Sequence, residues 1–207
     1  MIHIVSKFKM AYSQGENIRS DADLYNVVMT MFKFSLVTWG SLAVLGIAFH
    51  NIAGCAVFFL VYWPLRIFAG GLHFKTHKRC YFVSVIIFLV MMLAYKNREL
   101  FMWKYYSSSF VISAFIIVML SPVQDINKPL TDGEQKEYAC ISNRLLAIAL
   151  LVYYFISNIS CIQNSEFTFF YQYAIKLLAL QLMLGKLKNY AVQMYAIEWQ
   201  KRMGIKR

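Results

Sequence analysis

One stretch of the sequence concentrates the residue types that can do chemistry. It runs from 66 to 80 and reads Arg-Ile-Phe-Ala-Gly-Gly-Leu-His-Phe-Lys-Thr-His-Lys-Arg-Cys. It holds two of the four histidines, two adjacent glycines and one of the four cysteines. Three interpretations are open: a basic loop that anchors to lipid, a metal site, and a cysteine nucleophile with a histidine base.

A zinc site would use His73, His77 and Cys80, which share one face if the stretch is helical. Zinc takes His and Cys ligands, but structural sites need four ligands and catalytic sites three with an open position. The sequence offers no evident fourth ligand, and the basic side chains nearby would repel a cation. We therefore expect no metal and no cofactor.

Cys80 has the surroundings of a nucleophilic thiol. A thiol becomes reactive where cationic neighbours or a helix N-terminus favour the thiolate. Cys80 follows a cluster of basic residues and lies at the predicted N-terminal end of the apolar segment 81–95, where the helix dipole favours an anion. The other cysteines, Cys55, Cys140 and Cys161, lack this combination.

Two histidines compete for the role of base. His77 precedes Cys80 by three residues, which makes them neighbours on a helix. His73 precedes it by seven residues, about 10 Å away on a continuous helix. A contact between His73 and Cys80 therefore needs a bend, which the flexible pair Gly70-Gly71 permits. Helix spacing alone favours His77.

The apolar segments that must position these residues are long enough to cross a membrane. Of 207 residues, 59% are hydrophobic and 15% charged, against about 45–50% and about 25% in soluble domains. Four stretches carry no charged residue: 34–65, 80–95, 105–124 and 145–165. Since a spanning helix needs about 20 apolar residues, we predict an all-α, polytopic membrane helical bundle. The net charge of +11 then indicates anionic head groups as partners, and not nucleic acid.

About six hydrophobic segments are expected, at 34–49, 52–67, 81–95, 105–123, 145–165 and 167–185. His50, Asn51 and Gly54 predict a turn between the first two, although a re-entrant hairpin or one long tilted helix would also fit. The chain is expected to be a single membrane-embedded domain, 1–207. It would comprise an N-terminal interfacial, amphipathic segment 1–33, a transmembrane bundle 34–185 and a basic cytoplasmic tail 186–207, with loops at 66–80 and 124–144.

The distribution of basic residues predicts the orientation of this bundle. With six spans, both termini and both of these loops lie on one side, which carries seventeen Lys and Arg, against three on the other side. The positive-inside rule then places both termini in the cytoplasm. The remaining basic residue, Lys176, interrupts the last span. It either faces the bundle interior or a cavity, or is a polar break in a poor helix.

Two motifs resemble a known family. The pattern Arg-x-x-x-Gly-Gly-x-His-x6-Cys is formed by Arg66, Gly70, Gly71, His73 and Cys80. The stretch 121–130, Ser-Pro-Val-Gln-Asp-Ile-Asn-Lys-Pro-Leu, supplies a second match. Both are similar to motifs of the accessory gene regulator protein B family (AgrB), membrane-embedded cysteine endopeptidases of Gram-positive bacteria, and the resemblance covers nearly the whole chain.

The resemblance implies an activity and a site in the bacterial cell membrane. Members cleave the C-terminal part from a short quorum-sensing propeptide (AgrD-like) and help to form a cyclic thiolactone or lactone peptide. It implies Cys80 as nucleophile with His73, and not His77, as its partner. The expected partners are therefore the propeptide, which should have an amphipathic leader, a central Cys or Ser and an acidic tail, together with the lipid bilayer and a second copy in a homodimer.

Supporting roles are open for the other motif residues. Arg66 would clamp a substrate carboxylate, stabilise an oxyanion or extend to lipid head groups. Asp125 and Asn127 could approach His73 from the second loop, as could backbone carbonyls. Lys128 and Pro129 would form a rigid or substrate-docking element.

A non-enzymatic function is the alternative. In it the protein transports or escorts a small peptide, Cys80 is merely structural, and Lys176 with the polar segment 157–166 lines a pathway.

Overall fold

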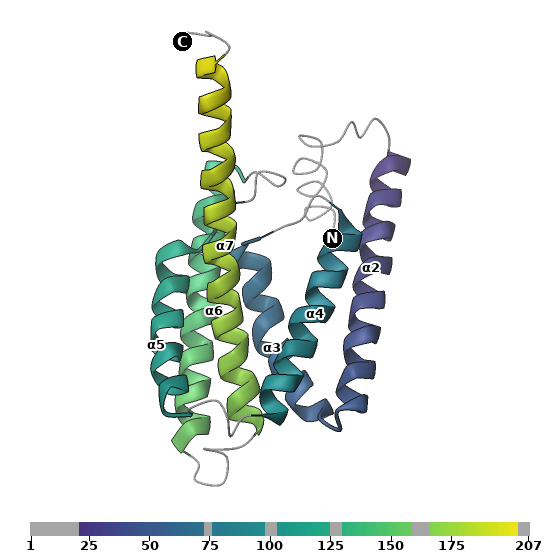
Figure 1. The fold of residues 1–207 in the computed structure, drawn as a ribbon, viewed down its shortest axis with the longest axis vertical. Coiled ribbons are helices and arrows are strands. Elements are labelled where there is room, and N and C mark those ends of the chain that lie inside the picture. Colours follow the sequence, from purple (N-terminus) through teal and green to yellow (C-terminus); the bar gives the residue numbers. More distant parts are fainter. Residues whose placement is uncertain (1–20, 73–75, 98–102, 125–129, 159–165, 203–207) are drawn as a thin grey trace.

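The described part of the chain is a bundle of six helices. The structure is a computed structural model, and it describes residues 21–72, 76–97, 103–124, 130–158 and 166–202. These ranges form six α-helices and no strand: α2 (Asp21–Ala48), α3 (Ile52–Ala69), α4 (His77–Lys96), α5 (Trp103–Leu120), α6 (Asp132–Asn158) and α7 (Glu166–Arg202). Figure 1 shows them standing side by side along one axis.

Four of these helices have the length and composition of membrane spans. They are Ile52–Ala69, Lys78–Lys96, Asp132–Asn158 and Glu166–Tyr195, and two shorter apolar helices cover Phe32–Ala48 and Ser108–Leu120. Large apolar side chains on their outer faces are exposed, as expected for contact with lipid; Leu60, Val111 and Phe155 are each at least two-thirds exposed. The predicted all-α membrane bundle is confirmed.

A tight turn separates α2 from α3, as predicted. His50 takes a positive φ of 53°, and the Asn51 side chain caps α3 by accepting a hydrogen bond from the Gly54 N–H at 2.9 Å. Gly54 has no room for a side chain, because an added Cβ would lie 2.4 Å from the Phe170 ring. The stretch 34–65 therefore contributes to two helices and not to one long one.

The span with the lowest hydropathy, α7, is the central helix. In its membrane-spanning stretch 61% of the residues are buried, against at most 28% in the other three spans. It carries buried polar side chains, among them Thr168 and Gln172, which lie inside the protein. In a bilayer the polar segments turn inward and the apolar ones face lipid, so weak hydropathy marks the interior of this bundle.

Two apolar clusters flank α7. One joins it to α2, α3 and α4, with Phe58, Met91 and Phe170 at its centre. The other joins it to α3, α5 and α6, with Leu65 and Ile117 at its centre. Because both clusters include α3, the helices α3 and α7 form the rigid pair on which the rest of the bundle packs.

The predicted loop 124–144 is wrong from residue 132 onward, where α6 begins. A capping box starts this helix: the Glu134 carboxylate accepts from the Thr131 N–H at 3.0 Å and from its hydroxyl at 2.9 Å. In return the Thr131 hydroxyl accepts from the Glu134 N–H at 3.4 Å. The Thr-x-x-Glu pattern of the sequence signals this helix start. At the other end α6 stops at Asn158, and residues 159–165 of the predicted span lie outside the described ranges.

Two predicted terminal segments also continue helices. The predicted basic tail 186–207 is helical over 186–202, where α7 continues to Arg202, since no Gly or Pro interrupts this stretch. Residues 21–33 of the expected interfacial segment are the first turns of α2, continuous with the span that follows. Residues 1–20 and 203–207 lie outside the described ranges.

The two motif segments lie at the same end of the bundle. In Figure 1 the connection from α3 to α4 and that from α5 to α6 are both at the upper end, where α7 also extends beyond its neighbours. This is the end that the distribution of basic residues predicts to be cytoplasmic.

Candidate functional site

Arg66 lies in the last turn of α3 and holds the chain that follows. Its Nη2 donates a hydrogen bond to the backbone oxygen of Leu72 at 2.6 Å. Its Nη1 is buried and has no hydrogen-bond partner in the described part of the chain. The guanidinium is thus engaged inside the protein and does not extend to lipid head groups.

The two glycines of the first motif adopt backbone conformations that only glycine tolerates. Gly70 has φ 73° and ψ −142°, and Gly71 has φ 116°. Space is equally restricted, because an added Cβ would lie 2.3 Å from the Val123 oxygen at Gly70 and 2.8 Å from Arg66 Nη1 at Gly71. The Gly-Gly pair therefore serves a sharp change of direction at the end of α3.

Val123 joins the second motif to the first. Its N–H donates to the Ala69 oxygen at 2.9 Å, and its oxygen accepts from the Gly71 N–H at 3.1 Å. These bonds form an isolated parallel bridge between Gly70 and Val123. The two motifs, recognised separately in the sequence, thus form one backbone unit.

The central helix α7 holds the same segment from the other side. The Leu72 N–H donates to the Gln181 backbone oxygen at 3.3 Å. Gly185 makes room for this approach, since an added Cβ there would lie 2.9 Å from the Gly71 carbonyl carbon. The residue before His73 is therefore held by α3 through Arg66 and by α7 through Gln181.

Cys80 lies in the first turn of α4. Thr76, in an extended conformation, precedes the helix, and the Cys80 N–H donates to the Thr76 oxygen at 3.2 Å. Cys80 is exposed. The predicted position of the thiol at a helix N-terminus is thus observed.

Of the two candidate bases, only His77 lies within the described ranges. His73 and its neighbours 74 and 75 lie outside the described residues, and of His77 only the backbone, at the start of α4, is described. Because α4 begins at residue 77, positions 73 and 80 do not share one continuous helix, so the two-turn separation does not apply. The chain changes direction at Gly70 and Gly71, and the contact between His73 and Cys80 stays a prediction.

The remaining predictions concern the second motif and a metal site. Asp125, Asn127, Lys128 and Pro129 lie outside the described residues. Among the residues that are described, no group of three His, Cys, Asp or Glu could hold a metal ion. The zinc alternative depends on His73, which is not among them.

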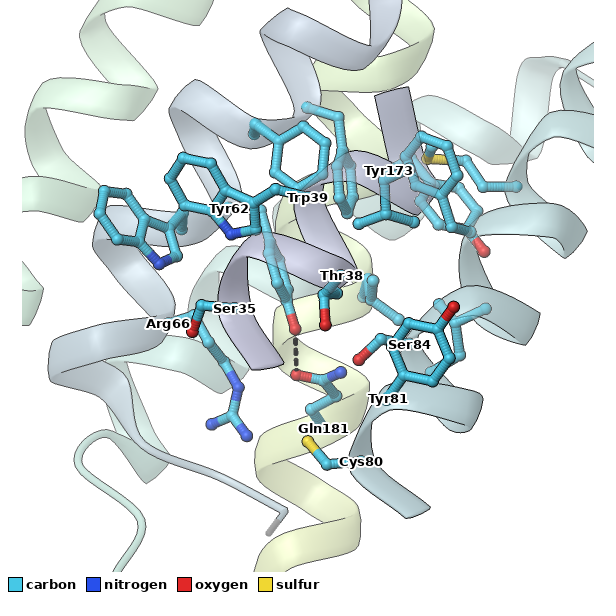
Figure 2. Close-up of a pocket in the computed structure, with 18 of the residues that line it drawn as sticks. Ser35, Thr38, Trp39, Tyr62, Arg66, Cys80, Tyr81, Ser84, Tyr173 and Gln181 are labelled. Atoms are coloured by element: carbon cyan, nitrogen blue, oxygen red, sulfur yellow. Dashed lines mark hydrogen bonds between the residues drawn. The ribbon is translucent and has the colours of Figure 1, made fainter. Parts of the chain in front are cut away.

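A cavity of about 440 Å³ opens beside Cys80, between α2, α3, α4 and α7. Nine of its nineteen lining residues are aromatic, and Figure 2 shows Arg66, Gln181 and Cys80 together at one end of it. The lining includes Phe34, Trp39, Phe58, Phe59, Tyr62, Trp63, Tyr81, Phe88 and Tyr173, with the hydroxyls of Ser35, Thr38 and Ser84. Such a site can hold an apolar side chain next to a thiol and a cation.

Sequence reasoning missed Tyr62, Gln181 and Gly185. The Tyr62 hydroxyl donates to Gln181 Oε1 at 2.5 Å, and Tyr62 lines the cavity together with Arg66 and Cys80. A polar residue in a predicted span is a functional signal in its own right. Gln181 carried that signal in the predicted span 167–185.

Lys176, the cation predicted inside a span, lies in α7 and is partly buried. Its Nζ donates to Gln172 Oε1 at 3.2 Å, and the Gln172 amide donates to the Tyr153 hydroxyl of α6. Lys176 does not line the cavity. It belongs to a polar contact between α6 and α7 inside the bundle, which is the first of the two positions considered for it in the sequence.

The thiols offer a direct check on the position of Cys80. Cys80 and Cys140 are both exposed, but only Cys80 lies in the first turn of its helix. We expect iodoacetamide to label Cys80 about fivefold faster than Cys140 below pH 8, because a helix N-terminus favours the reactive thiolate. Mass spectrometry of peptides from the folded protein in detergent measures both rates. Equal rates would contradict the expectation, and the buried Cys55 provides a slow reference.

Comparison with known proteins gives a family. The family model described as AgrB: Accessory gene regulator B matches residues 4–185. This range includes both motifs, the cavity and the part of α7 that carries Gln181 and Gly185. No curated protein and no solved structure matches the chain.

Proposed function

Since the chain belongs to the accessory gene regulator B family and so takes part in quorum-sensing peptide processing, we propose that it is a membrane cysteine endopeptidase. Its substrate is a short AgrD-like propeptide, cleaved on the C-terminal side. The observation that carries the proposal is Cys80, an exposed thiol at the start of α4 that opens onto a cavity shared with Arg66.

The first step is acyl transfer to sulfur. The Cys80 thiolate attacks a carbonyl carbon of the bound propeptide, while His73 takes the thiol proton and then gives it to the leaving amine. The C–N bond breaks and the C-terminal fragment leaves. The N-terminal part remains as a thioester on Cys80.

Ring closure uses the energy of that thioester. A thiol or hydroxyl inside the bound peptide attacks the thioester carbonyl, forms the thiolactone or lactone and returns the thiolate to Cys80. Water would hydrolyse the thioester instead, so the site must exclude it. The aromatic walls of the cavity support this, since they offer apolar surface next to the sulfur.

Residues of the first motif and of α7 would position the segment that carries His73 and a polar group of the substrate. Arg66 and Gln181 anchor Leu72 from opposite sides, so the segment that leads to His73 has a fixed starting point. The buried Nη1 of Arg66, without a partner in the residues described, would receive a carbonyl or carboxylate of the substrate.

Trapping the acyl-enzyme tests the proposal. The probe is a synthetic AgrD-like propeptide with an amphipathic leader and an acidic tail, and with its central Cys or Ser replaced by Ala so that no ring can close. We expect the protein in vesicles to gain the mass of the N-terminal fragment on Cys80, and neutral hydroxylamine to remove it, because thioesters react with hydroxylamine. Cys140→Ser should behave like the wild type, since Cys140 lies on α6 outside the cavity.

Two outcomes would contradict the proposal. One is release of the C-terminal fragment without any adduct on Cys80. The other is transport of intact propeptide across the vesicle membrane without cleavage, which would favour the transporter or escort alternative.

A further inference from the structure

Gln181 brings a neutral amide into a membrane span at the reactive end of the cavity. It lies on α7 and lines the cavity together with Cys80 and Tyr62. Its Oε1 accepts the Tyr62 hydroxyl at 2.5 Å. Because the oxygen end of the amide is held by Tyr62, the NH2 end is directed elsewhere and is available to donate.

Gln181 is fixed in relation to the proposed catalytic groups. Its backbone oxygen accepts from the Leu72 N–H at 3.3 Å, one residue before His73. Its side-chain partner, Tyr62, lines the same cavity as Cys80. Figure 2 shows the amide and the sulfur at the same end of the cavity.

Attack by a thiolate creates a need for a hydrogen-bond donor. When the S–C bond forms, the carbonyl π electrons move onto oxygen, and the resulting oxyanion requires N–H donors in a low-dielectric site. The nucleophile's own backbone N–H is a common donor in other hydrolases. Here the Cys80 N–H is already bonded to the Thr76 oxygen at 3.2 Å. A side-chain donor beside the sulfur can supply this hydrogen bond instead.

We propose that the Gln181 carboxamide is this donor, binding the oxyanion of the carbonyl that Cys80 attacks, and that Tyr62 is the positioning residue that orients it. The inference rests on the proposed peptidase function. During collapse the C=O bond re-forms, the C–N bond breaks and the amine takes the proton from His73. Gln181 gains and loses no proton.

Substitutions at Gln181 test this role. Gln181→Ala removes the amide, and Gln181→Glu keeps its shape while removing the N–H donors. We expect kcat for release of the C-terminal fragment to fall by about 10² to 10³-fold in both variants. KM should stay within about threefold, since the donor acts on the transition state. Gln193→Ala, an exposed glutamine of the same helix, should match the wild type.

A second readout separates the oxyanion role from a structural one. Gln181→Glu is not used for this readout, because its carboxylate would repel the Cys80 thiolate. Iodoacetamide alkylates Cys80 without forming an oxyanion, so its rate should be unchanged within about twofold in Gln181→Ala. A parallel fall in alkylation and cleavage would show that Gln181 only supports the fold, and would overturn the inference. So would a kcat within about threefold of the wild type in both Gln181 variants.

Tyr62→Phe tests the positioning role. Without the hydroxyl the amide is free to rotate, and we expect kcat to fall about tenfold. Adding Tyr62→Phe to Gln181→Ala should cost nothing further, because Tyr62 acts through Gln181; additive losses would overturn its positioning role. Failure of this inference can be told apart from failure of the proposed function. If the inference fails, the Cys80 thioester still forms at the wild-type rate in Gln181→Ala. If the proposed function fails, the thioester does not form even in the wild type.

Discussion

Replacing Cys80 with serine is expected to abolish release of the C-terminal fragment of the propeptide. Without an activating environment tuned to it, a hydroxyl is a much weaker nucleophile than a thiolate, and loss of a nucleophile costs on the order of 10⁴-fold or more in kcat. The chain should still insert and fold, because Cys80 is exposed and belongs to neither apolar cluster. Cleavage of a synthetic propeptide in vesicles, followed by mass spectrometry, measures the loss.

His73→Ala and Cys140→Ser complete that experiment. The kcat of His73→Ala should fall to a similar level, because nucleophile and base act as one unit. His77→Ala should retain most of the cleavage activity. Cys140→Ser is the matched control, since this thiol is also exposed but lies on α6. Full cleavage by Cys80→Ser would rule out the peptidase chemistry. Loss in His77→Ala with retention in His73→Ala would transfer the role of base to the residue that helix spacing favours.

Replacing Gly70 with alanine is expected to damage both stability and activity. Its φ of 73° and ψ of −142° lie in a region that is essentially restricted to glycine. A Cβ would also lie 2.3 Å from the Val123 oxygen, a backbone atom that cannot rotate away. Strain of this kind costs about 1–3 kcal/mol before the clash is counted. Relieving it would separate the two motif segments and displace the chain that leads to His73.

We therefore expect Gly70→Ala to lower cleavage by about 10²-fold or more, as small misplacements at a catalytic site do, and to lower the midpoint of thermal unfolding in detergent. Gly133→Ala is the matched control, since nothing lies within 4 Å of its added Cβ and it lies in the first turn of α6. It should be neutral or stabilising by up to about 1 kcal/mol. Equal behaviour of the two variants would show that the bridge to Val123 is dispensable.

Several features of the site were readable from local sequence. Arg66, Gly70, Gly71 and Cys80 were recognised from residue types and spacing, because a sharp turn demands glycine and a thiol at a helix start has distinctive chemistry. The capped start of α6 is equally local, in Thr131 and Glu134, but the charged residues around it also suit a loop. Polar composition alone does not distinguish a loop from a polar helix.

The membrane class, the turn at His50 and Asn51, and the motif residues at one end of the bundle could all be predicted without coordinates. These depend on the length of uncharged runs, which bilayer thickness sets, and on backbone preferences of single residues. The folded chain was needed to show that α7 is central, that Val123 pairs with Gly70, and that Gln181 contacts Tyr62, 119 positions away. Contacts between such distant residues arise from the packing of whole helices, and they leave no periodic pattern in the chain.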